Sequence, residues 1–112
     1  MNNKRLGTEW ERQFCKMLAD DGYWVHFITP DNRGAQPFDI IAVRNGVAYA
    51  YDCKTCVSNT FSISRLEDNQ MMAFDKWLAC GNSMPHIAVL HNDKTFLLPY
   101  DLLKTSGKIK LE

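Results

Sequence analysis

The stretch PFDIIAVRNGVAYAYDCKTC (37–56) contains the pattern that decides the fold. Asn45-Gly46 is typical of the two-residue turn that joins antiparallel strands, and the residues on either side of it are rich in β-branched and aromatic types. The sequence therefore predicts a hairpin, with strands over 38–43 and 47–55. A turn this short places the two strands side by side.

Strand alternation divides the second strand of the hairpin into two faces. The predicted core face is bulky and carries Val47, Tyr49, Tyr51 and Cys53. The other face begins with Ala48 and Ala50 and ends with Asp52 and Lys54. Asp39, a carboxylate in the otherwise apolar first strand, is expected to converge on that pair across the hairpin.

Convergent carboxylates repel each other and lose hydration unless a cation lies between them. A hard divalent ion such as Mg²⁺, which prefers oxygen ligands, is the usual solution. A lysine beside such an ion can orient the attacking water and neutralise charge that develops on a phosphate. Asp39, Asp52 and Lys54 therefore suit phosphodiester hydrolysis, and the alternative is a charged, solvated strand face.

Patterns outside the hairpin predict further helices and strands in one α/β domain. Apolar residues recur at helical spacing from Leu6 to Leu18, and Asp20-Asp21-Gly22 ends that helix. The remaining predicted elements are a strand over 23–28, a helix from the capping box Ser64-Arg65-Leu66-Glu67 to about Cys80, strands over 86–91 and 95–98, and a short helix over 100–105. We expect a single domain over 1–112 with a mixed five-stranded sheet flanked by helices.

The composition is consistent with a single small domain but does not indicate a particular function. The chain has 112 residues, of which 46% are hydrophobic, and its 13 basic and 13 acidic residues cancel. It shows neither a leader pattern nor a long apolar run, so a cytoplasmic location is expected. The four scattered cysteines are expected to be free thiols.

The spacing of Cys53 and Cys56, C-x-x-C, raises a competing interpretation as a redox motif or half of a zinc site. Alternation puts the two thiols on opposite faces unless the strand ends at Thr55, and neither a second C-x-x-C nor a histidine pair follows. A redox motif normally opens a helix, whereas VSNTFSI (57–63) is not helical. Cys56 receives no role.

Two further polar positions are candidates for the site. Gln70 lies within the apolar stripe of the helix that begins near residue 64, where a buried amide must find a hydrogen-bond partner. Glu9 and Glu11 flank the apolar stripe of the first helix at similar angles, so periodicity does not choose between them.

Several pieces of the chain, in order, resemble the PD-(D/E)XK nuclease superfamily, and more closely the Holliday-junction resolvases of the RecU and Hjc types. RLGTEWERQF (5–14) resembles the first helix of these enzymes, and the hairpin stretch resembles their acid and acid-x-lysine strands. FSISRLEDNQMMAF (61–74) resembles the RecU segment that presents a glutamine, and TFLLPYDLL (95–103) resembles the last strand and helix. The resemblance implies a restriction-endonuclease-like core.

The resemblance also implies roles for individual residues. Glu11, Asp39, Asp52 and the Cys53 main-chain carbonyl would bind Mg²⁺, with Mn²⁺ as an alternative. Lys54 would position the hydroxide, and Gln70 would lie at the edge of the site. The implied reaction is metal-dependent endonucleolytic cleavage of DNA that leaves a 5′-phosphate and a 3′-hydroxyl.

Two departures from the family bear on these expectations. The family often has glutamate in place of Asp52, and its resolvases tend to be basic, whereas this chain is neutral. We expect a homodimer that pools its basic residues for binding a four-way junction in recombination and repair; the candidates are Lys4, Arg5, Arg12, Arg33 and Arg65. The alternatives are a nuclease of the same fold with another DNA substrate and a catalytically weak DNA-binding module.

Overall fold

The computed structural model describes residues 3–29 and 36–112 of the chain. A five-stranded sheet in the order β1-β2-β3-β5-β6 forms its centre. The strands are β1 (Trp24–Phe27), β2 (Ile40–Arg44), β3 (Val47–Thr55), β5 (His86–His91) and β6 (Lys94–Pro99). Among these five described strands the β3–β5 pair is parallel and the other pairs are antiparallel, so the sheet is mixed, and the predicted architecture is confirmed.

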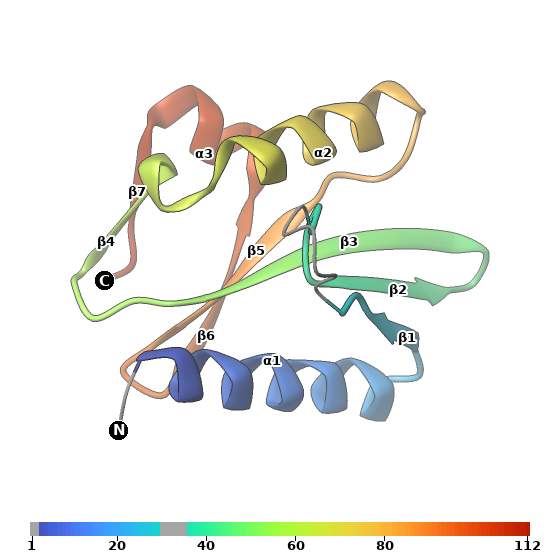
Figure 1. Ribbon diagram of the computed structural model, residues 1–112, viewed down its shortest axis with the longest axis horizontal. Helices are drawn as coiled ribbons and strands as arrows, with labels where there is room; N and C mark the ends of the chain where they lie inside the picture. The colour runs from blue at the N-terminus through green and yellow to red at the C-terminus, as the bar shows by residue number, and fades with distance from the viewer. Residues whose placement is uncertain (1–2, 30–35) are drawn as a thin grey trace.

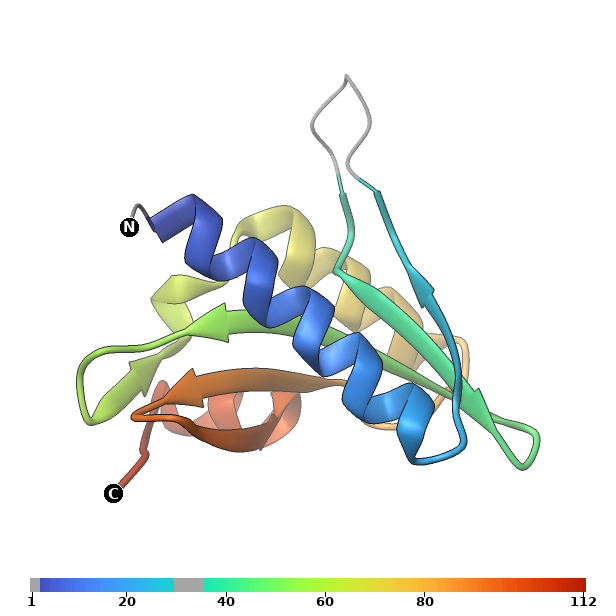
Figure 2. The same cartoon turned by 90° about the horizontal axis from the view of Figure 1, so that it is seen from below.

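Helices cover both faces of this sheet (Figure 1). Helix α1 (Asn3–Asp20) lies on one face, while α2 (Asp68–Ala79) and α3 (Tyr100–Ser106) lie on the other. Figure 2, seen from the side of α1, shows that helix crossing the sheet obliquely. Among the described residues, no helix combines the length and apolar character needed to cross a membrane.

The hairpin forms as the sequence predicts. Asn45 and Gly46 both have positive φ, 54° and 76°, which is the backbone conformation that a type I′ turn requires. The turn pairs Ile40 with Tyr51 in the β2–β3 ladder. One step beyond that pair, the N–H of Asp39 donates to the Tyr51 carbonyl (3.1 Å) and its own carbonyl accepts from Ile28 N–H (2.7 Å). The backbone of Asp39 is therefore fixed between two strands.

Alternation in β3 divides the hydrophobic core into two layers. Tyr51 and Cys53 pack against α1 with Trp10 and Phe14. Ala50 faces the other layer, where the buried side chains of the sheet, α2 and α3 meet. Val47 was predicted to join the core, but it is 41% exposed because it lies next to the hairpin turn.

The structure differs from the sequence-based prediction in three additional short elements and in the start of α2. A second, two-stranded sheet pairs β4 (Thr60–Ser62) with β7 (Lys108–Lys110), and the 3-10 helix η1 (Ile63–Arg65) follows β4. The capping box predicted at Ser64 to Glu67 is wrong, because Ser64 belongs to η1 and its N–H donates to Ser62 Oγ (3.2 Å). Helix α2 begins one turn later, where Glu67 N–H donates to Oε1 of Gln70 (3.0 Å).

Candidate active site

Two buried carboxylates lie together where β2 begins and β3 approaches its end. Asp39 is 7% exposed and Asp52 is fully buried. Continuing the β2–β3 register by one residue beyond Ile40 and Tyr51 sets Asp39 opposite Asp52. Lys54, two residues further along β3, extends from the same face as Asp52. The structure thus brings together the three side chains that the hairpin pattern singled out.

Both carboxylate oxygens of Asp39 accept a hydrogen bond from an uncharged donor. The main-chain N–H of Cys53 donates to Oδ2 (2.8 Å), and the side-chain amide of Gln36 donates to Oδ1 (2.7 Å). These bonds set the direction of the carboxylate while leaving lone pairs on each oxygen, because a carboxylate has about four acceptor sites. Asp39 is therefore held in one orientation but not saturated.

Asp52 has one satisfied and one unsatisfied oxygen. Gln70, the amide predicted to need a partner, donates from Nε2 to Oδ1 (3.1 Å). Oδ2 accepts no hydrogen bond from residues 3–29 and 36–112, although Lys54 Nζ lies 3.3 Å from it as an ion pair. Burial, and after it the negative charge of Asp39, raises the pKa of Asp52 well above its ordinary value, while Lys54 opposes that shift. A second positive charge beside Oδ2 would stabilise the ionised form.

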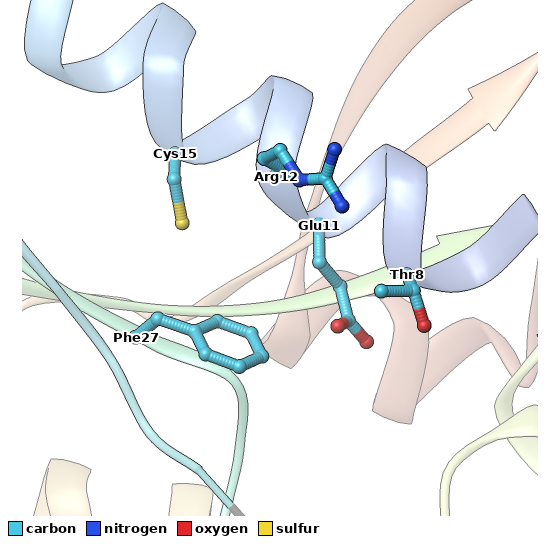
Figure 3. A pocket seen from close by; sticks show the side chains of 5 residues that line it. All are labelled: Thr8, Glu11, Arg12, Cys15 and Phe27. Carbon is cyan, nitrogen blue, oxygen red and sulfur yellow. The ribbon is translucent and has the colours of Figure 1, made fainter. Parts of the chain in front are cut away.

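Glu11, on α1, lies near enough to Asp39 and Lys54 for their charges to act on its pKa. Burial and the charge of Asp39 raise its pKa to about 7, and Lys54 acts in the opposite direction. Glu11 lines a pocket of about 320 Å³ between α1 and β1, together with Thr8, Arg12, Cys15 and Phe27. Figure 3 shows its carboxylate extending away from the helix axis into this space. Glu9 does not line the pocket.

The three acids have donor chemistry suited to a hard divalent cation. The atoms that they offer to a metal are all carboxylate oxygens, and the buried Oδ2 of Asp52 accepts no hydrogen bond from any residue that the structure describes. Within residues 3–29 and 36–112, no three acidic, histidine or cysteine side chains are close enough together to enclose an ion. Asp39, Asp52 and Glu11 therefore fit a divalent ion by chemistry and charge rather than as a closed cage.

The predicted DNA-binding residues are only partly placed relative to this site. Arg33 and the side chains of Lys4 and Arg5 lie outside the described part of the chain. Arg12 lines the pocket beside Glu11. Arg65, the last residue of η1, is exposed, and its side chain reaches the end of β3, where Nη2 donates to the Thr55 carbonyl (2.8 Å); its guanidinium lies 5.3 Å from the Phe61 ring centroid.

The two cysteines of C-x-x-C belong to different layers of the core. Cys53 packs on the α1 side, and Cys56 packs among the side chains beneath α2 and α3. All four cysteines are free, as predicted. The thiol of Cys56 donates to the Ser58 carbonyl (3.3 Å), so this residue stabilises the turn that leads into β4. The structure thus supports the packing interpretation of Cys53, and it adds a packing role for Cys56, to which the sequence assigned none.

Sequence reasoning missed Gln36 and Asn69 as parts of this site. Gln36 contacts Asp39 directly, and Asn69 Nδ2 donates to the Gln36 main-chain carbonyl (2.6 Å). The available signal was an amide three residues before the candidate acid and directly before Pro37. Proline restricts the preceding residue to extended conformations, which limits the directions that the amide can take.

The raised pKa of Glu11 predicts how the stability of the metal-free protein depends on pH. The native state binds this proton more tightly than the unfolded chain, since the pKa rises from 4.5 to about 7. The stabilising contribution is therefore complete below about pH 4.5 and is lost as the pH rises through 7. Between pH 5 and 8 the melting temperature should fall less in Glu11→Gln than in the unsubstituted protein, by on the order of 5 °C.

Thermal melts in EDTA at several pH values test this prediction. Asp52 shifts stability in the same direction but is present in both proteins, so the comparison isolates Glu11. Parallel melting curves for the two proteins across this range would contradict the assignment.

Comparisons with known proteins agree on one family. Residues 2–112 match the family model described as archaeal Holliday junction resolvase (Hjc). The crossover junction endodeoxyribonuclease Hjc of Methanocaldococcus jannaschii is 26% identical over 104 residues, which cover 93% of this chain and 73% of that protein. The structure of Archaeoglobus fulgidus Hjc, a Holliday junction resolvase, matches with a TM-score of 0.70 over 91% of this chain and 85% of that chain. At 17% identity, this structural match shows the same fold.

Proposed function

The chain belongs to the archaeal Holliday junction resolvase (Hjc) family of the PD-(D/E)XK superfamily, and from this premise we propose that it cleaves four-way DNA junctions with a divalent metal ion. The proposed ion is Mg²⁺, with Mn²⁺ as an alternative. The observation that carries this proposal is the fully buried Asp52, whose Oδ2 lies 3.3 Å from Lys54 and has no hydrogen-bond donor in the described part of the chain. A carboxylate in this state needs further positive charge.

Each residue has a distinct proposed role. Asp39, Asp52 and Glu11 hold the ion, and the main-chain carbonyl of Cys53 is a further proposed ligand. A bound divalent ion supplies Lewis-acid activation of water and stabilises charge on the phosphate. Gln70 orients Asp52 through its amide, which leaves Oδ2 for the ion.

Lys54 acts on the attacking water and on the scissile phosphate. Its ammonium orients the hydroxide for in-line attack on phosphorus and offsets the negative charge that grows on the phosphoryl oxygens. The attacking oxygen forms a new bond to phosphorus as the bond between phosphorus and the O3′ oxygen breaks. The proton lost by the attacking water passes to solvent, and O3′ takes up a proton from solvent. The products of this reaction are a 5′-phosphate and a 3′-hydroxyl.

Two cuts across a junction require two sites, which a twofold-symmetric homodimer supplies. In the proposed dimer, Arg12 and Arg65 bind phosphates beside each site. Arg65 donates only one described hydrogen bond, to Thr55, and a guanidinium has five donors, which leaves donors for a phosphate. The proposed location is the cytoplasm. Sedimentation of the protein alone and with a junction measures the oligomeric state.

A substrate comparison tests the proposed function. Labelled four-way junction, linear duplex and single strand are incubated with the protein in Mg²⁺ or in EDTA. We expect paired nicks in the junction with Mg²⁺ and none in EDTA. Equal cutting of linear duplex would indicate another DNA nuclease, and junction binding without any cutting would indicate an accessory DNA-binding module. Undiminished cleavage in EDTA would rule out the metal site.

A further inference from the structure

Gln36 makes a short side-chain contact to the buried Asp39. Its Nε2 lies 2.7 Å from Asp39 Oδ1, whereas its second contact, to the Phe38 carbonyl, is 3.5 Å long. The opposite oxygen of Asp39 accepts the Cys53 main-chain N–H at 2.8 Å. Gln36 is therefore the side chain that sets the rotation of the Asp39 carboxylate, because the main-chain donor alone fixes only one oxygen.

The main chain of Gln36 is itself tied to α2. Asn69, in the first turn of that helix, donates from Nδ2 to the Gln36 carbonyl at 2.6 Å. Both residues are half-buried, which shields this bond from competing water. The contact joins two segments that lie 33 residues apart in the sequence.

The next residue of the same turn serves the second carboxylate. Gln70 donates to Asp52 Oδ1 at 3.1 Å. The first turn of α2 thus reaches Asp52 directly through Gln70 and Asp39 indirectly through Asn69 and Gln36. In each case an uncharged side-chain amide holds one carboxylate oxygen; among the described residues the other oxygen of Asp52 has no hydrogen-bond donor, and that of Asp39 accepts the Cys53 main-chain N–H.

We propose that Gln36 is a positioning residue for metal binding, and that Asn69 acts through it by anchoring its main chain to α2. This inference rests on the proposed function and adds to it the group that aligns Asp39 with Asp52. A neutral amide suits this role, because it donates a hydrogen bond to the carboxylate and carries no positive charge. A lysine in its place would compete with the metal ion for the carboxylate. Hydrogen-bond partners of metal-binding side chains typically change metal affinity by about 10–100-fold when they are removed.

Metal titration of three variants separates positioning from simple structural support. Gln36→Met keeps the length of the side chain and removes the donor, and Asn69→Ala removes the anchor. We expect calorimetric Mn²⁺ affinity to fall about 10–100-fold in Gln36→Met, and by less in Asn69→Ala. The double variant should match Gln36→Met alone, since Asn69 has nothing left to position. Gln13→Met, an exposed glutamine on α1, is the matched control and should bind like the unsubstituted protein.

The same series distinguishes this inference from the proposed function. If Asp39→Asn abolishes Mn²⁺ binding while Gln36→Met leaves it unchanged, the metal site stands and the positioning role is overturned. Fully additive losses in the double variant would overturn the route through Asn69. A protein that binds no Mn²⁺ even without substitution would overturn both proposals. A loss of melting temperature with unchanged affinity would assign Gln36 to the fold alone.

Discussion

Lys54→Ala is expected to slow single-turnover cleavage of a four-way junction by about 10²–10⁴-fold, the range for losing a positioned group that handles charge and protons in the transition state. The half-buried ammonium of Lys54 lies 3.3 Å from Asp52 and is the positive group in ion-pair contact with it. Junction affinity, measured by gel shift in EDTA, should remain within about threefold, because long-range phosphate contacts supply most of the binding free energy.

Two substitutions control this measurement. Lys76→Ala removes an exposed lysine from the last turn of α2 and should leave the cleavage rate unchanged. Lys54→Arg keeps the charge but places it on a larger, planar group, so it should restore only part of the rate. Cleavage by Lys54→Ala within a few-fold of the unsubstituted protein would remove Lys54 from the mechanism.

Trp10→Ala should produce the largest loss of stability, about 3–5 kcal/mol in the free energy of unfolding. The indole is 2% exposed and lies against Phe14 with ring centroids 5.6 Å apart. Its Nε1–H donates to the Ala88 carbonyl in β5 (2.9 Å), which ties α1 to the centre of the sheet. Truncation therefore opens a cavity and leaves a buried acceptor with one fewer donor.

Trp24→Ala is the matched comparison for Trp10. Trp24 is 63% exposed on the edge strand β1 and stacks on His26, with ring centroids 6.1 Å apart. Its substitution should change the free energy of unfolding by no more than about 0.5 kcal/mol, as is usual for surface positions. Urea denaturation followed by circular dichroism measures both variants. Equal losses for the two would contradict the placement of α1 against β5.

The features that the sequence predicted correctly depend on local chemistry. Asn45-Gly46 specifies its turn through positive φ angles that other residue pairs rarely adopt, and the turn sets the register of β2 and β3. That register brings Asp39, Asp52 and Lys54 together without reference to any other part of the chain. Most of the candidate site was therefore predictable, because it is built on one hairpin.

The errors arose where distant segments decide the outcome. Ser64 to Glu67 matches the capping-box pattern, whereas the structure forms the box at Glu67 to Gln70, whose first residue is not the serine or threonine that the pattern requires. The chain enters η1 from β4, whose partner β7 is close to the C-terminus, as in the pair Thr60 and Lys110. Strands of three residues with so remote a partner leave no local periodicity.

Packing between distant segments also explains why the sequence did not choose between Glu9 and Glu11 and why it missed Gln36. Glu9 and Glu11 differ in their relation to the pocket only through the rotation of α1 on the sheet. The main chain of Gln36 is held at the site by a hydrogen bond from Asn69, which the packing of α2 brings next to it. Neither the rotation of α1 nor the position of α2 can be inferred from the spacing of residues in the sequence.

Gln70 uses both ends of one carboxamide, since Oε1 accepts the Glu67 N–H at the start of α2 while Nε2 donates to Asp52. Fraying of the first helical turn and release of Asp52 are consequently a single opening event. Exchange of the Glu67 amide hydrogen with deuterium requires the same event, because that hydrogen is the one that Gln70 accepts. The exchange rate of this one backbone position therefore reports how long the Asp52 carboxylate keeps its orientation, and it can be measured in the protein without DNA.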